Sequence, residues 1–298
     1  MTEKRRKILI AVDGSDNSFE SIKYIGGSPS FKEMNLTLFN VLSRIPEHYY
    51  DFEDWTPLSQ RIREIHAWDT MNEEEIKEYM EKAKKYLLSK GFREDGVITS
   101  IRERKRGIAR DIKDEADKDY IFVVVGRKGI GNIKGTFFGS VASKLLERLS
   151  FVPLLVVGKN PKAGKIIIAL DGSASSMRSV EYVGNIMKGS NSEIKLVHVI
   201  RSGYSEYLKE LEIRIESFFE SAKKKLQRSG IDPKTISTKI ISGAQSRAVA
   251  IYHEATQSKF DTIVVGRRGL SRVQSFVMGR VSNKVIQIAK NKAVWIIN

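Results

Sequence analysis

The chain carries the same sequence pattern twice, and this duplication limits its fold more than any other feature. KILIAVDGSDNS at residues 7–18 matches KIIIALDGSASS at residues 165–176. LFNVLSR at residues 38–44 matches LVHVIRS at residues 196–202. Repeats this far apart are much longer than the unit of a solenoid, so they indicate that a whole domain was duplicated.

A glycine-rich stretch is also present in both halves. VVVGRKG at residues 123–129 corresponds to IVVGRRG at residues 263–269. The offset between the halves is 171 − 13 = 158 at the aspartates of the two DGS motifs, and it falls to 266 − 126 = 140 at the first glycines. The first half therefore carries 158 − 140 = 18 extra residues between these two points.

Each half alternates short apolar runs with polar, amphipathic stretches. Runs such as KILIAV, IFVVVG and PLLVVG are continuous and β-branched, which is typical of strands buried on both faces of a parallel sheet. Between them lie helical patterns that end at Gly91 and Gly230. The sequence predicts an α/β fold of two tandem domains, each a doubly wound, five-stranded parallel sheet with helices on both faces. For a sheet of this class we assume the strand order 3-2-1-4-5. The turn-rich KNPKAG predicts domains at residues 1–158 and 159–298.

The composition disfavours several classes of function. Because the chain has no cysteine, it has no disulfides, thiolate metal sites or cysteine nucleophiles, and it fits a cytoplasmic location. Its four histidines show no HExxH-type spacing, which disfavours a metal enzyme. The first apolar run is too short for a signal peptide and no run is long enough to span a bilayer, so we expect no membrane association.

The net charge of +15 is unevenly spread. Residues 1–158 hold 27 basic and 25 acidic residues, a net of +2, whereas the remaining 140 residues hold 24 and 11, a net of +13. A basic half could bind nucleic acid or another polyanion. The charges are scattered rather than blocked, however, so we favour a solvated surface.

The glycine-rich stretch predicts a ligand site. In such sheets ligands bind at the carboxyl ends of the strands, where the order 3-2-1-4-5 would place Asp13 opposite Gly126. Gly126-x2-Gly129 would bring main-chain amides close to a ligand, and Gly139-Ser140, nine residues later, would open a helix whose amides suit phosphate. A simpler interpretation assigns the same residues to turns and helix caps. Because the whole pattern is repeated, we favour a nucleotide with its base near Asp13.

The sequence lacks the signatures of several enzymes. It contains no GxxxxGK[ST] loop, no GxGxxG after the first strand, no GxSxG elbow and no HRD motif. VDGSDNS also lacks the double glycine of the SGGxDS-like loop in nucleotidyl-transferring enzymes. We therefore expect no turnover enzyme, although slow hydrolysis by positioning alone stays open.

Together, the DGS motif and Gly126-x2-Gly129-x9-Gly139-Ser140 resemble the ATP-binding class of universal stress proteins, over nearly the whole chain. The resemblance implies HUP-type Rossmann-like domains, a role in stress response or signalling, and ATP or AMP as ligand, with Mg²⁺ as an option beside ATP. It also implies an internal pseudo-dimer in which the fifth strands, at 152–158 and 293–298, pair, and a further homodimer stays open. The binding residues predicted for the first half are Ala11, Val12, Asp13, Val41, Val125, Gly126, Lys128, Gly129, Gly139, Ser140, Val141 and Ala142.

The second half departs from this pattern at one position. Arg280 stands where the family prefers Ser or Thr, so it could clasp a phosphate or block it, and Ser282 could restore a hydroxyl. We expect the first site to be the more typical ATP site and the second to be altered, AMP-selective or empty. The residues predicted for the second site are Ala169, Leu170, Asp171, Val199, Gly266, Arg268, Gly269, Gly279, Arg280, Val281 and Ser282.

Two alternatives stay open. The extra segment of the first half, about residues 43–72, is rich in aromatics and could form a lid or a partner surface, although anchoring of a long loop is the simpler interpretation. The chain could also be a stress protein that binds no nucleotide and uses its basic C-terminal half on nucleic acid or another polyanionic partner.

Overall fold

The structure is a computed structural model. It describes residues 5–43, 59–127, 139–202, 208–269 and 278–298, with the main chain alone at residues 59–72 and 208–209.

Within the described residues each half contains five strands, as the sequence predicts. Those of the first half are β1 (Lys7–Ala11), β2 (Asn35–Leu42), β3 (Val97–Glu103), β4 (Tyr120–Gly126) and β5 (Leu154–Val157). Those of the second half are β6 (Lys165–Ala169), β7 (Glu193–Arg201), β8 (Ile236–Ala244), β9 (Thr262–Gly266) and β10 (Ala293–Ile297).

In the part of the chain that the structure describes, four helices accompany the strands of each half. They are α1 (Asp16–Gly26), α2 (Ser59–Ser89), α3 (Ile108–Ala116) and α4 (Ser140–Arg148), followed by α5 (Ala174–Ile186), α6 (Leu208–Arg228), α7 (Arg247–Gln257) and α8 (Arg280–Ile288). Single 3₁₀ turns lie at Pro29–Phe31, Glu94–Gly96 and Pro233–Thr235.

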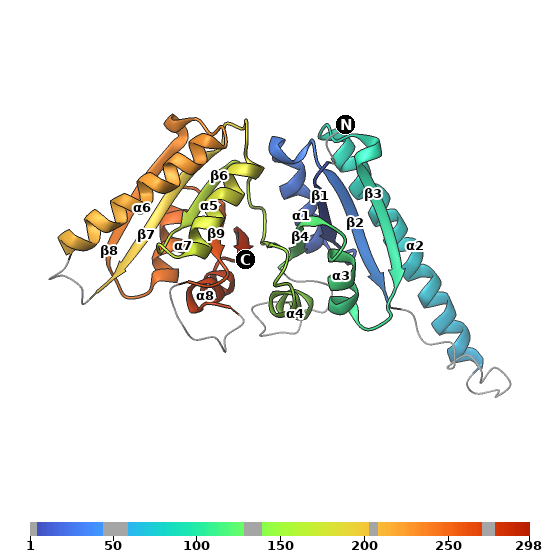
Figure 1. The fold of residues 1–298 in the computed structure, drawn as a ribbon. Helices are drawn as coiled ribbons and strands as arrows, with labels where there is room; N and C mark the ends of the chain where they lie inside the picture. The colour runs from blue at the N-terminus through green and yellow to red at the C-terminus, as the bar shows by residue number, and fades with distance from the viewer. Residues whose placement is uncertain (1–4, 44–58, 128–138, 203–207, 270–277) are drawn as a thin grey trace.

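The ten strands form one sheet of order β3-β2-β1-β4-β5-β10-β9-β6-β7-β8. Each half therefore has the predicted order 3-2-1-4-5. The halves join where β5 and β10 pair antiparallel, with Leu154 opposite Ile296, whereas the other described pairs are parallel. This is the pairing of fifth strands that the resemblance implied, and it leaves β3 and β8 as the outer edges, at opposite ends of the molecule (Figure 1).

Apolar side chains fill a core on each face of the sheet. Ile8 and Ile10 of β1 belong to the core that α1, α2, α5 and α6 cover. Leu9 and Ala11 belong to the core that α3, α4, α7 and α8 cover. Strands buried on both faces need apolar residues at successive positions, which explains the continuous runs in the sequence. Each core extends through both halves, so the duplication produces one continuous sheet.

The joint between the halves carries two equivalent tyrosines. The hydroxyl of Tyr24 on α1 lies 2.7 Å from Oγ1 of Thr262 on β9 and accepts a hydrogen bond from Trp295, at 3.2 Å. Reciprocally, Tyr182 on α5 donates to the carbonyl oxygen of Ile121 on β4. Burial raises the pKa of Tyr24 to about 12, so this hydroxyl remains protonated at neutral pH. The two halves are therefore held together by polar contacts as well as by strand pairing.

Candidate functional site

The loops that follow the first and fourth strands of each half meet at the carboxyl edge of the sheet. β1 pairs with β4, so that Ala11 lies opposite Val125. In the second half the approach is direct, because a methyl group built on Gly269 would lie 2.3 Å from Oδ2 of Asp171. The two distinctive loops thus meet at the edge of the sheet where its winding reverses, which is where a ligand crevice is expected in folds of this class.

The aspartate loops are tight turns that also begin a helix. Oδ1 of Asp13 accepts hydrogen bonds from the amide of Ser15, at 3.1 Å, and from its hydroxyl, at 2.6 Å. Ser15 in turn caps α1 by accepting from the amide of Ser18, at 3.2 Å. Gly14 between them has a φ of +83°, which favours glycine. One oxygen of the carboxylate therefore has a structural use, as the simpler interpretation requires, and this use fixes the orientation of the side chain.

The second half repeats this arrangement. Oδ1 of Asp171 accepts from the amide of Ser173, at 3.0 Å, and Ser173 caps α5 by accepting from the amide of Ser176, at 3.1 Å. Gly172 has a φ of +77°. The two aspartates are therefore presented in the same way.

The first glycine of each glycine-rich stretch serves helix packing. A methyl group on Gly126 would lie 2.9 Å from the main-chain oxygen of Asn17, and one on Gly266 would lie 2.6 Å from Oγ of Ser175. These distances are too short for a side chain. The glycines are needed because the first helix of each half crosses the end of the fourth strand here, a role that the sequence pattern does not distinguish from ligand contact.

The last glycine of each stretch begins a helix, as predicted. Gly139 is the N-cap of α4, and its amide donates to the main-chain oxygen of Arg127, at 2.9 Å. Gly279 is the N-cap of α8 and bonds Arg267 in the same way, at 2.8 Å. The first intrahelical hydrogen bonds run from the amide of Ser143 to the oxygen of Gly139 and from the amide of Asn283 to that of Gly279. The amides of residues 140–142 and 280–282 therefore have no acceptor within their helices and point out of the helix starts. Such an end attracts anions.

Most of the other predicted residues are apolar and have their side chains in the cores. One group packs toward α3, α4, α7 and α8, namely Ala11, Val41, Val125, Val141, Ala142, Ala169, Val199 and Val281. Val12 and Leu170 belong to the opposite core. A ligand in the crevice would therefore meet these residues through their main chain. Lys128 and Gly129 lie outside the residues that the structure describes, so their predicted contribution stays a prediction.

The second crevice differs from the first in its side chains. Arg268 and Arg280 are both exposed, whereas the residue at the start of α4 is the exposed Ser140. Ser282 is buried, and its hydroxyl donates to the main-chain oxygen of Gly266, at 2.6 Å. That hydroxyl closes the base of the loop and is thus already used within the domain.

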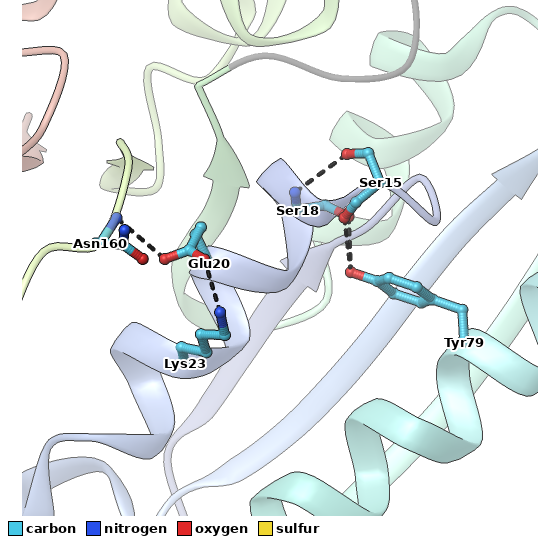
Figure 2. A network of polar contacts seen from close by, with 6 residues as sticks. All are labelled: Ser15, Ser18, Glu20, Lys23, Tyr79 and Asn160. Carbon is cyan, nitrogen blue, oxygen red and sulfur yellow. Dashed lines mark hydrogen bonds and ion pairs between the residues drawn. The ribbon is translucent and has the colours of Figure 1, made fainter.

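The covering helices add residues that sequence reasoning missed. The hydroxyl of Tyr79 on α2 lies 2.7 Å from that of Ser18, and Figure 2 shows its ring pointing toward the first turn of α1. Burial raises the pKa of Tyr79, so it stays protonated. On α6 the equivalent residue is Phe218, whose ring contacts that of His198, with centroids 5.4 Å apart. Both rings lie beside the DGS loops because α2 and α6 pack over these loops, and spacing along the sequence does not reveal this packing.

A second link fixes α1 from the other side. Glu20 accepts from Lys23, at 2.8 Å, and from the amide of Asn160 in the segment between the halves, at 3.0 Å (Figure 2). Helix α1, which follows the aspartate loop, is thus held by Tyr79 of α2 on one side and by the connecting segment on the other.

The remaining predictions concern metals, membranes and the aromatic segment. Among the described residues no group of three or more His, Cys, Asp or Glu could hold a metal ion. None of the described helices is long and apolar enough to cross a bilayer. Helix α2 begins at Ser59, so most of the aromatic segment, residues 44–58, lies outside the described part, as does the side chain of Trp68.

Comparisons with known proteins agree with this architecture. The model of the universal stress protein family matches residues 4–158 and again 162–297. A universal stress protein from Archaeoglobus fulgidus is 19% identical, with a TM-score of 0.66 over 99% of this chain and 98% of that one. A putative universal stress protein from Pseudomonas aeruginosa is 16% identical, with a TM-score of 0.58 over 98% and 93%. Universal stress protein YxiE of Bacillus subtilis is 26% identical over 42% of this chain and 93% of its own length.

Proposed function

The chain belongs to the universal stress protein family, and from this premise we propose that it binds an adenine nucleotide in the crevice of its first half and acts as a cytoplasmic stress-response protein without chemical turnover. The observation that carries the proposal is the start of α4, where Gly139 is tied to the loop after β4 and leaves the following amides pointing outward. We further propose that the two domains cover residues 1–158 and 159–298.

The ligand would lie along the carboxyl edge of the sheet. Its phosphates would meet the amides of residues 140–142 and the hydroxyl of Ser140, and its base would lie near Asp13 and the main chain of Val41. The electrostatic basis is the positive end of α4, which attracts anions. ATP and AMP both fit this chemistry. Among the described residues there is no group of three or more His, Cys, Asp or Glu that could hold a metal, so Mg²⁺ beside ATP would be bound mainly by the phosphates.

For the second crevice we propose an altered specificity. Arg280 introduces a long cation at the start of α8, and Arg247 donates to the main-chain oxygen of Val199, at 3.3 Å. Together with Arg268 these cations favour a compact, highly charged ligand, or they cover the site when no ligand is present. We therefore expect ATP to bind more weakly here than in the first crevice.

Titration calorimetry on the full chain tests the proposal. We expect ATP or AMP to bind, GTP to bind at least about tenfold more weakly because its base lacks the adenine amino group, and Ser140→Glu to abolish the tighter site. The control is Lys144→Gln, which also lowers the charge of α4 by one unit at an exposed position, one turn further along. A chain that binds neither ATP nor AMP contradicts the proposal. A Ser140→Glu variant that binds ATP as tightly as Lys144→Gln does also contradicts it.

The basic C-terminal half supports a second candidate, binding of nucleic acid or another polyanion. Its 24 basic residues against 11 acidic ones would give retention on heparin that falls steeply with salt. Absence of any copurifying adenine nucleotide from gently purified protein, together with such retention, would favour this candidate.

A further inference from the structure

A buried arginine beside each crevice contacts the opposite half of the molecule. Arg127 follows the first glycine of the N-terminal stretch, and only 6% of it is exposed. Its guanidinium donates to main-chain oxygens at the end of α8: to Ile286, to Gln287 at 2.6 Å and to Ala289 at 3.4 Å. The last carbonyls of a helix lack intrahelical donors, and a cation there also interacts favourably with the helix dipole.

Arg267 makes the reciprocal contact. It too is 6% exposed, and its guanidinium donates to the main-chain oxygens of Leu146, Leu149 and Glu147 at the end of α4, the last at 3.5 Å. It also donates to Oδ1 of Asn298, at 3.2 Å. Each half thus supplies the cation that completes the C-terminal end of a helix in the other half, and Figure 1 shows these helices, α4 and α8, on either side of the middle of the molecule.

The same arginines also hold the helix starts of their own crevices. The main-chain oxygen of Arg127 accepts from the amide of Gly139, and that of Arg267 accepts from Gly279. Helix α4 is therefore fixed at its start by the main chain of Arg127 and at its end by the side chain of Arg267. For α8 the two roles are exchanged.

From this exchange we infer that Arg267 is a positioning residue for the N-terminal crevice and Arg127 for the C-terminal crevice, so that each site is completed by the other half of the chain. This inference deepens the proposed function and rests on it. Helices of nine residues are short and stiff, so a shift at one end moves the outward amides at the other. A group that aligns such amides changes affinity without contacting the ligand.

The guanidinium is well suited to this role. Burial lowers the pKa of both Arg127 and Arg267, yet an arginine remains charged in proteins. Its planar fork spans several carbonyls of one helix end at once, which a lysine ammonium cannot do with the same geometry. The charge and the fork can therefore be separated by substitution.

The test uses the full chain and matched variants. With the C-terminal crevice silenced by Arg280→Glu, titration calorimetry measures ATP at the N-terminal crevice in Arg267→Met, Arg267→Lys and Arg127→Met backgrounds. Arg127→Met is the matched control. It removes an equivalent arginine from the same joint, but the side chain of Arg127 supports the C-terminal crevice, which is not the one measured. Thermal unfolding without ligand reports how far each variant is destabilised, and Arg267→Lys is the milder change if Arg267→Met fails to fold.

We expect Arg267→Met to weaken ATP binding at least about fivefold, Arg267→Lys to fall between it and the parent, and Arg127→Met to change it less than about twofold. Equal weakening by both methionine variants would overturn the inference, since it would indicate general loosening of the joint. Unchanged affinity in all variants would overturn it as well. If the parent itself binds no adenine nucleotide, the proposed function fails, and this result is distinct from parent binding that the arginines do not affect.

Discussion

Asn40 on β2 and His198 on β7 occupy equivalent places in the two halves, and each hydrogen-bonds the main-chain carbonyl just beyond the first strand of its half. Nδ2 of Asn40 donates to the oxygen of Val12, at 2.9 Å, and Nδ1 of His198 lies 2.8 Å from the oxygen of Leu170. Because a carbonyl oxygen only accepts, Nδ1 must carry a proton, which the neutral imidazole can supply. The two crevices thus have the same hydrogen bond, made in the first half by a side chain that does not titrate and in the second half by one that does.

This difference predicts a pH dependence that comes from one half alone. Burial lowers the pKa of His198, with a further lowering by Arg247, against opposite effects of the bond to Leu170 and of Asp171. In the unfolded chain a histidine has a pKa of about 6.5. Since the unfolded state takes up the proton first, we expect this contribution to the free energy of unfolding to be complete above about pH 6.5 and to be lost as the pH falls toward the folded pKa.

Urea denaturation between pH 5 and 8 measures this contribution, and His198→Asn provides the control. The variant installs the residue that the first half uses, which keeps a donor for the carbonyl of Leu170 and removes the titration. We expect the variant to lose less stability than the parent over this range. Identical pH profiles would show that His198 does not couple folding to protonation.

A second prediction concerns the packing role of Gly126. The nearest atom to an added methyl group is a main-chain oxygen, that of Asn17 at 2.9 Å, and main chain yields less readily than the tip of a side chain. Gly126→Ala should therefore lower the free energy of unfolding by about 1–3 kcal/mol. Gly279→Ala, where the nearest atom lies 3.4 Å away, should cost less than about 1 kcal/mol. Chemical denaturation compares the two, and equal costs would contradict the packing role.

The outcome at Gly126 illustrates how far sequence reasoning reaches. The duplicated pattern and the continuous β-branched runs predict two parallel sheets buried on both faces, whereas the strand order was assumed from the fold class and the pairing of the fifth strands was implied by the family resemblance. The helix starts at Gly139 and Gly279 were predicted from spacing. Packing of α1 against Gly126 depends on the angle between two elements, and spacing along one chain carries no information about that angle.

The residues that sequence reasoning missed have the same physical origin. Arg127 and Arg267 stand within the predicted motif, yet their guanidiniums act 159 and 118 positions away along the chain, at Ile286 and Leu149. A basic residue in a glycine-rich loop suggests phosphate contact, and only the relative placement of the two halves shows that these two point away from it. Ser282 carries the hydroxyl that the sequence suggests for the second site, but this hydroxyl is buried and donates to the main-chain oxygen of Gly266.

A third prediction concerns acid stability and the buried Glu254 of α7. It accepts from Lys195, at 2.9 Å, and Lys239, at 2.5 Å, and only 3% of it is exposed. Burial alone would raise its pKa, but the bonds from Lys239, Lys195 and Ser258 outweigh burial and lower the pKa to about 2. In the unfolded chain the pKa is about 4.3, so this stabilisation is complete above that pH and is lost as the pH falls toward about 2.

Glu254→Gln separates this group from the other carboxylates. At pH 7 we expect the variant to lose about 1–3 kcal/mol of unfolding free energy, because a charged acceptor for two lysines is removed. Near pH 2 the parent and the variant should converge. Glu210→Gln on α6, an exposed position, is the control and should change the stability at pH 7 less than Glu254→Gln does. A difference that stays constant with pH would mean that Glu254 acts by shape and not by charge.

The last prediction tests the division of the chain and the joint between its halves. Expressed alone, residues 159–298 would expose β10, whose residues are all buried in the full chain and include Trp295. An apolar edge strand of this kind pairs with another chain unless it is covered. The nearly symmetric joint offers an obvious partner, since a second copy would bring another β10, another Tyr182 and another Arg267 to the same positions.

We therefore expect this half to form a homodimer, with antiparallel β10 strands, that sedimentation analysis detects over a range of concentrations. Residues 1–158 should behave likewise through β5, and mixing the two halves should yield a heterodimer of the full chain's size. A folded, monomeric C-terminal half at high micromolar concentration would show that the joint needs both of its different surfaces, and that the duplicated halves no longer share one mode of assembly.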